Sequence, residues 1–412
     1  MCVLAVQSRL DKFCAVLGGF LPVGILVGNA GYESMIVLVG LAWVARSVLA
    51  RENPFPWLFR QTPALPWLFL VLSVYVSLAV NGPGAKGVLH DLAFIRHFLF
   101  LCAICDISRR IPIARYFLMG MAASVLLAGL NILLAHAIGM DLMGKPLARY
   151  YSKLKEATRI AGVFSFVAPA FFAWSISLPG LSRRVAGGMF GLGLAATMML
   201  LFVGVRIALI STLCGFGFWG IYLLYRRFSR KVLPTMILIV LLVSGLVVFY
   251  LSQQSWTSVH HRVSMYKVTW AMVMENPVFG VGVSGYQDAY KTMAASGKVA
   301  PYIAPDGRVW HELEASHAHS LVLMILACTG TVGLLVFGWL FLSVVRIAFT
   351  RSEPHWRSGL VVWPAVFLVN GLTGWSFFAD WYHAWFAYLV ALTWVVSTVD
   401  TPIADTPRPL KT

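Results

Sequence analysis

Long apolar runs separated by short polar segments dominate this sequence. A helix that crosses a bilayer needs about 20 mostly apolar residues, and runs of roughly that length recur along the 412 residues. We place them at 13–30, 33–50, 63–80, 88–105, 116–138, 162–178, 187–204, 206–225, 232–251, 320–342, 359–377 and 383–399. The pattern predicts an all-α, polytopic integral membrane protein of about twelve transmembrane helices, with residues 1–412 forming a single multi-pass membrane domain.

The composition agrees with a bilayer environment. Hydrophobic residues make up 59% of the chain and charged residues only 12%, against about 25% charged residues in soluble domains. All six cysteines lie near the N-terminus or in apolar runs, which argues against a disulfide framework. For Cys102 and Cys105, packing is favoured over redox or metal chemistry. The basic Arg9 and Lys12 precede the first run without a small-residue cleavage site, which favours a retained first helix.

Two longer polar segments, 139–161 and 252–319, interrupt the apolar pattern between predicted helices 5 and 6 and between helices 9 and 10. The larger segment contains five of the ten histidines: His260, His261, His311, His317 and His319. From Arg262 onward, apolar and aromatic residues recur at helical spacing, which predicts a helix along the membrane face that ends at Asn276-Pro277. The glycines of the GVGVSG stretch that follows lack the context of a dinucleotide site, so close backbone packing is the better interpretation.

The basic residues orient the chain. Every short loop on one side is basic, as cytoplasmic loops are, and with both tails this side carries 19 of the 32 lysines and arginines. Both termini are then cytoplasmic and both polar segments lie outside. The formal charge of +16 therefore does not call for a nucleic-acid partner. Yet twelve basic residues fall on the outer side, which indicates an anionic partner at the outer leaflet. They are Lys86, Lys145, Arg149, Lys153, Lys155, Arg159, Arg206, Arg262, Lys267, Lys291, Lys298 and Arg308.

Two of these arginines stand beside apolar runs. Arg206 separates LLFVGV from IALISTL, and a charge so close to hydrocarbon is costly unless it is paired or hydrated. Arg159 directly precedes the sixth run, where an interfacial snorkelling anchor is the alternative. Arg96, inside the fourth run with His90 and Asp91 nearby, fits an internal structural network better than a site.

His317 and His319 directly precede the tenth run. A histidine in this position can exchange a proton near neutral pH. The pair could instead bind zinc, but the segment has no H-E-x-x-H, no D-x-D and no cysteine, which disfavours a metal site. An interfacial polar role for either histidine stays open.

Four motifs occur in one order over roughly residues 150–345. They are RIAGVFSFVAPAFFA, GVRIALI, RVSMYKVTWAMVMENPVFGVGVSGY and HAHSLVLMILACTGTVGLLVF. Together they resemble the motifs of the bacterial O-antigen ligase and O-antigen polymerase superfamily. The chain departs from that pattern at Ser320, where Asn is commoner, at Gly204-Val205 before the arginine, and at Tyr266, where Trp is expected. His319 is the histidine that matches the motif.

The resemblance implies a GT-C-like helical bundle in the inner membrane of a Gram-negative bacterium, with a large helical periplasmic loop. It implies a glycosyltransferase that moves O-antigen glycan from undecaprenyl diphosphate to the lipid A–core oligosaccharide in lipopolysaccharide synthesis. The reaction would be inverting and would need no metal or cofactor. Arg159, Arg206 and Arg262 would bind the diphosphate, and His319, Arg262 and Arg206 would be catalytic. Supporting positions would be His317, Arg149 and Lys267.

Two alternatives remain open. An O-antigen polymerase of the same superfamily would carry nearly the same motifs. A transporter or flippase for an anionic lipid-linked glycan would use the same arginines, but it predicts symmetry between the two halves of the chain, which the sequence does not show.

Overall fold

The computed structural model describes residues 2–82, 85–138, 154–227, 256–305, 307–375, 377–378 and 381–398. Within these ranges the chain is almost entirely helical, which confirms the all-α prediction. The predicted span 232–251 and most of the predicted 139–161 loop lie outside them. In chain order the elements are α1 (Cys2–Gly19), α2 (Leu21–Val27), α3 (Asn29–Ala50), α4 (Phe55–Gln61), α5 (Ala64–Asn81), α6 (Ala85–Leu92), α7 (Ile95–Ile107), α8 (Ala114–Ile138), α10 (Leu154–Ser177), α11 (Arg183–Val203), α12 (Arg206–Arg227), α14 (Trp256–Glu275), α15 (Tyr286–Ala295), β1 (Tyr302–Ile303), β2 (Val309–Trp310), α16 (Leu321–Thr350), α17 (Pro354–Leu360), α18 (Val362–Thr373) and α19 (Tyr382–Ser397).

Among the described residues, eight helical stretches are long and apolar enough to cross a membrane, or up to nine if the bent pair α1–α2 is one span. The predicted run 13–30 crosses this 52° bend instead of forming one straight helix. Pro22 stands in the first turn of α2, and a proline there cannot continue the hydrogen bonding of a preceding helix.

The last two predicted spans are shorter than expected. Run 359–377 divides into α17 and α18, and run 383–399 becomes the 16-residue α19. Every residue of α19 is buried. A helix that is apolar on all sides can be buried in a protein core as well as in lipid. The apolar pattern alone therefore could not predict the lengths of the helices in these two runs.

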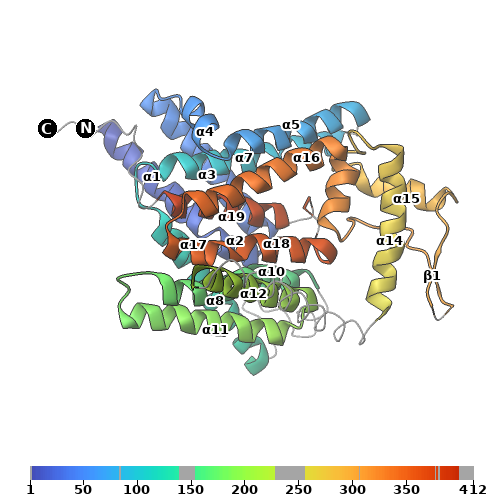
Figure 1. The fold of residues 1–412 in the computed structure, drawn as a ribbon. Helices are drawn as coiled ribbons and strands as arrows, with labels where there is room; N and C mark the ends of the chain where they lie inside the picture. The colour runs from blue at the N-terminus through green and yellow to red at the C-terminus, as the bar shows by residue number, and fades with distance from the viewer. Residues whose placement is uncertain are drawn as a thin grey trace.

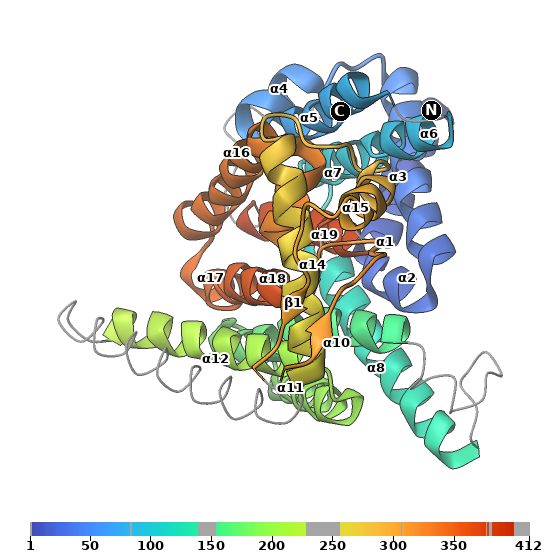
Figure 2. The same cartoon turned by 90° about the vertical axis from the view of Figure 1, so that its right-hand side faces the viewer.

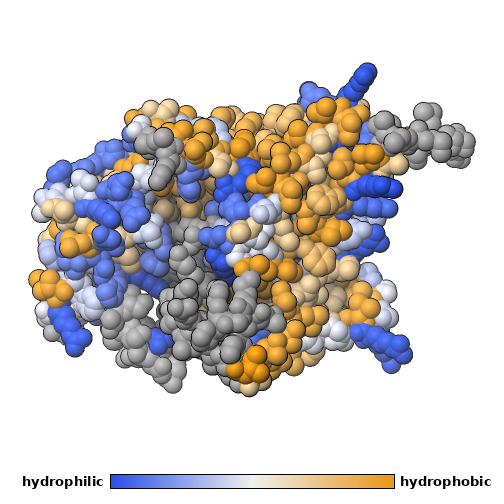
Figure 3. All heavy atoms as spheres, turned by 180° about the vertical axis from the view of Figure 1, so that it is seen from behind, coloured by the Kyte–Doolittle hydropathy of each residue, from blue (hydrophilic) through white to orange (hydrophobic). Residues whose placement is uncertain are grey.

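The bundle helices lie side by side, and α14 crosses one end of them (Figure 1, Figure 2). Seen from behind, apolar residues cover much of the bundle surface, and hydrophilic residues gather on the α14 side and at the opposite end (Figure 3). This banding is what a protein spanning a bilayer presents. Helix α14 lies at one hydrophilic end of the bundle (Figure 3) and ends at Glu275, directly before Asn276-Pro277, where the sequence pattern predicted its end.

Helices α14 and α15 and the hairpin β1–β2 form a small unit, which we call the α14 module. The hairpin pairs Tyr302 with Trp310 in antiparallel register. Thr269 of α14 hydrogen-bonds the Tyr286 hydroxyl of α15 at 2.8 Å, and the Ser264 hydroxyl of α14 donates to the Trp310 carbonyl at 3.3 Å. These contacts tie α14 to both α15 and the hairpin.

The module is joined to the bundle by backbone hydrogen bonds between Pro277–Gly282 and a break in α16. The Val281 amide donates to the Ala327 carbonyl at 2.8 Å, and the Gly282 amide donates to the Cys328 carbonyl at 3.0 Å. Two helix carbonyls are thus satisfied from outside the helix. We call this junction the interlock; it confirms that the glycine-rich stretch serves close backbone packing.

Gly330 makes the interlock possible. Its φ of 66° and ψ of −167° interrupt α16, and only glycine enters this region without strain. A β-carbon at Gly330 would also collide with the Val278 carbonyl. Helix α5 supports the junction, because the Ser77 hydroxyl donates to Cys328 at 2.8 Å and the Asn81 amide donates to Gly280 at 3.0 Å.

Candidate functional site

Two of the predicted site residues, distant in sequence, meet at the end of the bundle that α14 crosses. Arg262 lies on the second turn of α14, and His319 directly precedes Ser320, the N-cap of α16. The Tyr266 hydroxyl, one turn after Arg262, donates to the His319 carbonyl at 3.2 Å. The charge of Arg262 acts on both Tyr266 and His319. The structure therefore joins Arg262, Tyr266 and His319 in one cluster.

His319 has a restrained backbone and a restrained ring. Its φ is 50°, a left-handed value that few residues other than glycine adopt. Its ring Nδ1 lies 3.2 Å from the Gly374 carbonyl oxygen. A carbonyl oxygen can only accept, so Nδ1 carries the proton and Nε2 keeps its lone pair. His319 can therefore accept a proton at Nε2.

The surroundings of His319 favour its neutral form. Burial lowers the pKa of its imidazole, the Gly374 hydrogen bond raises it, and the positive charge of Arg262 lowers it again. The net direction is downward from the usual 6.5, so at neutral pH the ring is uncharged. Burial also lowers the pKa of Arg262, with Tyr266 acting the other way. A guanidinium nevertheless stays protonated in proteins.

Arg262 differs from the arginines at the far end of the bundle. Across the residues that the structure describes, no carboxylate lies within ion-pair distance of Arg262. By contrast Arg46 pairs with Asp11 at 3.4 Å, and Arg110 pairs with Asp106 at 2.5 Å. A half-buried guanidinium with no acidic partner has its charge open to an anionic substrate.

Arg159 has a similar character. Only 7% of the residue is exposed, which is the opposite of a snorkelling anchor. Its Nη2 donates to the amide oxygen of Asn29, the first residue of α3. Its buried Nε has no hydrogen-bond partner within the described ranges. Because an amide oxygen is neutral, this bond orients Arg159 without cancelling its charge.

Arg206 begins the helix that packs against Gly374, the residue whose carbonyl binds His319. Arg206 is exposed, and this helix is α12. A β-carbon built on Gly374 would lie 3.0 Å from Cγ2 of Ile207, the next residue. The first turn of α12 therefore packs directly against the residue whose carbonyl binds His319.

Two tryptophans connect this region to the helix of Arg159. Trp381 contacts Gly162, three residues after Arg159 on α10. The ring of Trp381 meets the ring of Trp375 edge to face at 5.5 Å, and Trp375 directly follows Gly374. No motif in the sequence marked Trp375, Trp381 or Asn29 as site residues. The tryptophans stand at the edges of two apolar runs, where they read as span residues, and Asn29 carried no signal.

The supporting positions differ in placement. The His317 ring lies 4.1 Å from the His319 ring, and its Nδ1 lies 2.9 Å from the Ser316 hydroxyl. The Lys267 ammonium lies 5.4 Å from the ring centre of Tyr302 on β1. His317 therefore adjoins the cluster and Lys267 faces the hairpin. Arg149 lies outside the described residues.

The polar residues of the fourth run form structural contacts. Arg96 Nη2 donates to Glu33 at 2.8 Å, and the Ser284 amide and hydroxyl each donate to the Asp91 carboxylate at 3.1 Å. Asp91 thus fixes the chain just after the interlock, in agreement with the structural interpretation of this group.

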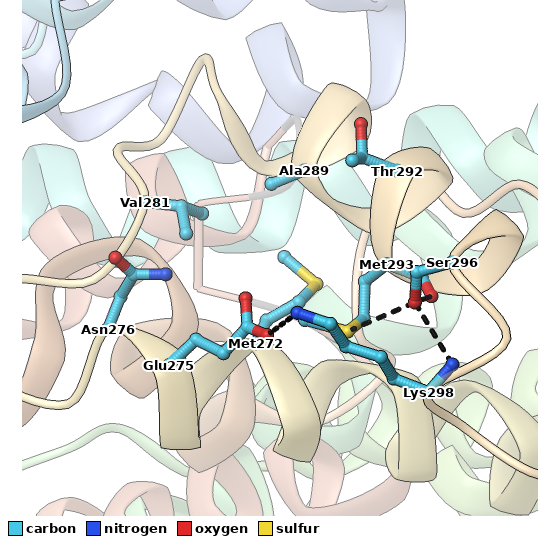
Figure 4. A pocket seen from close by; sticks show the side chains of 9 residues that line it. All are labelled: Met272, Glu275, Asn276, Val281, Ala289, Thr292, Met293, Ser296 and Lys298. Carbon is cyan, nitrogen blue, oxygen red and sulfur yellow. Dashed lines mark hydrogen bonds and ion pairs between the residues drawn. The ribbon is translucent and has the colours of Figure 1, made fainter.

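A groove of about 200 Å³ lies elsewhere on the α14 module (Figure 4). Met272 in its wall comes ten residues after Arg262, about 15 Å farther along the helix axis. Lys298 and Glu275 at its rim pair with each other at 2.6 Å. The groove is therefore separate from the arginine–histidine cluster. Its lining residues are Met272, Glu275, Asn276, Val281, Ala289, Thr292, Met293, Ser296 and Lys298. In the described part of the chain, no three histidine, cysteine, aspartate or glutamate side chains are grouped as metal ligands.

The fold and this cluster define a polytopic, all-helical membrane protein with an arginine–histidine site at one end of its bundle. Residues 188–338 match the model of a family described as O-antigen ligase. This match, over somewhat more than a third of the chain, supports a relationship to the O-antigen ligase and polymerase superfamily. The matched region contains Arg206, Arg262 and His319. No curated protein matches the chain.

Proposed function

We propose that this protein is an O-antigen ligase that transfers O-antigen glycan from undecaprenyl diphosphate to the lipid A–core oligosaccharide. One observation carries the proposal: a neutral histidine with a free Nε2 lies beside an arginine without an acidic partner, at one end of a membrane bundle. A base next to a site for an anionic leaving group is what glycosyl transfer from a lipid diphosphate requires.

In the proposed reaction the hydroxyl oxygen of the acceptor attacks the anomeric carbon of the donor glycan. A carbon–oxygen bond forms to the acceptor, and the bond from the anomeric carbon to the diphosphate oxygen breaks. Nε2 of His319 takes the hydroxyl proton while its Nδ1–H remains on the Gly374 carbonyl. Attack opposite the leaving group inverts the anomeric configuration.

The arginines would act on the other product, undecaprenyl diphosphate. Arg262 and Arg206 would neutralise charge on the leaving diphosphate as the bond breaks, and Arg159 would bind the diphosphate with them. Guanidinium groups bind phosphate oxygens through paired N–H donors. Three such cations supply the charge that a divalent metal supplies in other transferases, so we propose a metal-independent reaction.

This chemistry sets the orientation in the membrane. The donor glycan and the acceptor core meet at the periplasmic face of the inner membrane. The α14 module would therefore lie in the periplasm and both termini in the cytoplasm. The basic loops of the opposite face agree with this orientation.

The decisive test supplies the purified protein with undecaprenyl-diphosphate-linked glycan and lipid A–core. Glycan attached to the core is the expected product. Longer lipid-linked glycan with no core product would identify a polymerase instead. Movement of the lipid-linked glycan across vesicles without any transfer would identify a transporter.

Metal independence has its own test. The same reaction in EDTA should proceed at the rate without EDTA. A loss of activity that zinc or magnesium restores would overturn the metal-free proposal and leave the ligase assignment intact.

A further inference from the structure

Three buried polar side chains meet in the apolar interior between α10, α12 and α18. Asn370 Nδ2 donates to the Ser165 hydroxyl at 2.9 Å, and the Ser211 hydroxyl donates to Asn370 Oδ1 at 2.8 Å. Asn370 is 1% exposed and both serines are fully buried. Each residue belongs to a different helix, so one amide group ties three helices together. We call this group the Asn370 hub.

The hub lies at a common depth beneath the candidate site. Ser165 follows Arg159 by six residues on α10, Ser211 follows Arg206 by five on α12, and Asn370 precedes Gly374 by four. At a helical rise of 1.5 Å per residue these separations are about 9, 7.5 and 6 Å. The hub therefore joins the helix of Arg159, the helix of Arg206 and the helix capped by Gly374, whose carbonyl accepts the hydrogen bond from His319.

The backbone of Asn370 extends the link to His319. Its carbonyl accepts hydrogen bonds from the Gly374 amide at 3.0 Å and the Trp375 amide at 3.1 Å, which closes the end of α18. The Gly374 carbonyl in turn accepts from His319 Nδ1. The hub is thus linked to the ring of the proposed base through the backbone of Asn370 and two further hydrogen bonds, Gly374 N–H to Asn370 and His319 Nδ1 to Gly374.

We propose that Asn370 is a positioning residue for transfer: through α18 it holds the Gly374 carbonyl on His319 Nδ1, which leaves Nε2 toward the acceptor. The inference rests on the proposed role of His319 as the base. A misplacement of a catalytic group by about 1 Å can lower the reaction rate about 10²-fold. A hub remote from the reacting atoms can therefore affect the rate by shifting the position of His319.

The titratable groups that face His319 define what a change at the hub should do. Arg262 and Tyr266 face it from α14, and His317 adjoins it in the chain. None of these contacts involves Asn370. Among the contacts that set the pKa of His319, the Gly374 hydrogen bond is the one that raises it. If Asn370→Ala displaces Gly374, the pKa of His319 falls and the neutral ring persists to lower pH.

The experiment measures this effect without substrate. Detergent-purified full-length protein is treated with diethyl pyrocarbonate from pH 5 to 8, and modification of the His319 peptide is followed by mass spectrometry. The expected result is a shift of the His319 profile to lower pH in Asn370→Ala. Transfer by the same preparation should show kcat reduced by roughly tenfold or more. Ser352→Ala is the matched control, because it removes a buried inter-element hydrogen bond, Ser352–Ser397 at 2.5 Å, at the opposite end of the bundle.

Each outcome decides one question. An unchanged His319 profile and unchanged kcat in Asn370→Ala, with only a lower unfolding temperature, would reduce the hub to a structural role. A shifted profile in a protein whose wild type transfers no glycan would support the link to His319 and refute the ligase proposal. If Asn370→Ala does not fold, Ser211→Ala removes one of the two amide bonds, and the same two measurements decide.

Discussion

At the scale of single residues, His319 is held by two different hydrogen bonds. Tyr266 holds its carbonyl at 3.2 Å and Gly374 holds its ring at 3.2 Å, while the backbone adopts a φ of 50°. Tyr266 stands where the superfamily pattern has tryptophan. The tyrosine hydroxyl donates the hydrogen bond to the His319 carbonyl, and a tryptophan at this position has no hydroxyl with which to make that bond.

His319→Ala tests the base directly. Removing a general base typically lowers the rate about 10²- to 10⁴-fold, so we expect transfer to the core to fall by at least about 10²-fold. His311→Ala is the control, because His311 Nε2 bonds the Ala294 carbonyl within the α14 module. Transfer close to the wild-type rate in His319→Ala would exclude the base assignment.

The pH profile follows from the direction of the pKa shift. His319 must be neutral to accept a proton, and its pKa lies below the usual 6.5. Activity should therefore be constant near neutral pH and fall only as the pH drops through that lowered pKa. Arg262 lowers the pKa of His319, so the acid limb of the residual activity of Arg262→Gln should move to higher pH. A limb that moves to lower pH would contradict the contact between these residues.

Arg262→Lys separates charge from geometry. Lysine keeps the positive charge but loses the paired donors of the guanidinium, and we expect transfer to fall about tenfold or more with wild-type stability. Arg308→Lys, on the exposed turn of the hairpin, is the control and should be neutral. The bidentate diphosphate role is falsified if Arg262→Lys is fully active.

At the scale of elements, the interlock fixes helix α14, which carries Arg262 of the candidate site. Helix α14 ends at Glu275, and the chain then inserts its backbone into the break of α16 at Gly330. The Asn276-Pro277 stop was predictable, because proline ends a helix locally. That the next residues would satisfy carbonyls of a helix fifty residues away was not, because a backbone hydrogen bond leaves no mark in side-chain pattern.

Gly330→Ala should break the interlock. The positive φ alone costs about 1–3 kcal/mol for a residue with a side chain, and the added β-carbon meets the Val278 carbonyl. We expect a lower unfolding temperature in detergent together with reduced transfer. Gly338→Ala on the same helix is the control: nothing lies within 4 Å of its β-carbon, so stability should be unchanged or slightly higher. Equal unfolding temperatures for both variants would refute the role of Gly330.

At the scale of the whole molecule, Arg262 and Arg159 differ from several other buried and half-buried arginines in lacking an acidic partner among the described residues. At the end away from α14, Arg46 and Arg110 are paired with acidic residues. At the α14 end Arg96 is paired with Glu33, whereas Arg262 and Arg159 have no acidic partner in the described ranges. The charge of an arginine paired with a carboxylate is already balanced within the fold. The charge of a buried or half-buried arginine without a carboxylate partner can be balanced by an anionic substrate.

Cysteine labelling tests the orientation. Ala295→Cys, exposed on the α14 module, should react with a membrane-impermeant maleimide in cells whose outer membrane has been permeabilised. Glu353→Cys, exposed at the opposite end, should react only after the inner membrane is opened. The wild-type chain gives the background of its native cysteines. The reverse pattern would refute the proposed periplasmic site.

The sequence by itself determined the fold class, and it singled out Arg262 and His319, which the structure then places together. Apolar run length and charge are local properties, and bilayer thickness and the cost of buried charge act on them directly. The lengths of the shorter C-terminal helices could not be predicted from the sequence, because a run such as α19 is equally apolar whether lipid or protein covers it.

Only the tertiary structure decided which residues meet. Gly374, Asn29, Trp381 and Asn370 act on the candidate site through backbone carbonyls, an amide oxygen and ring faces. Their partners lie from 55 residues away in the chain, as with Gly374 and His319, to 219 residues away, as with Trp381 and Gly162. Such contacts depend on how the helices pack, and helix packing is set by the whole bundle rather than by any one segment.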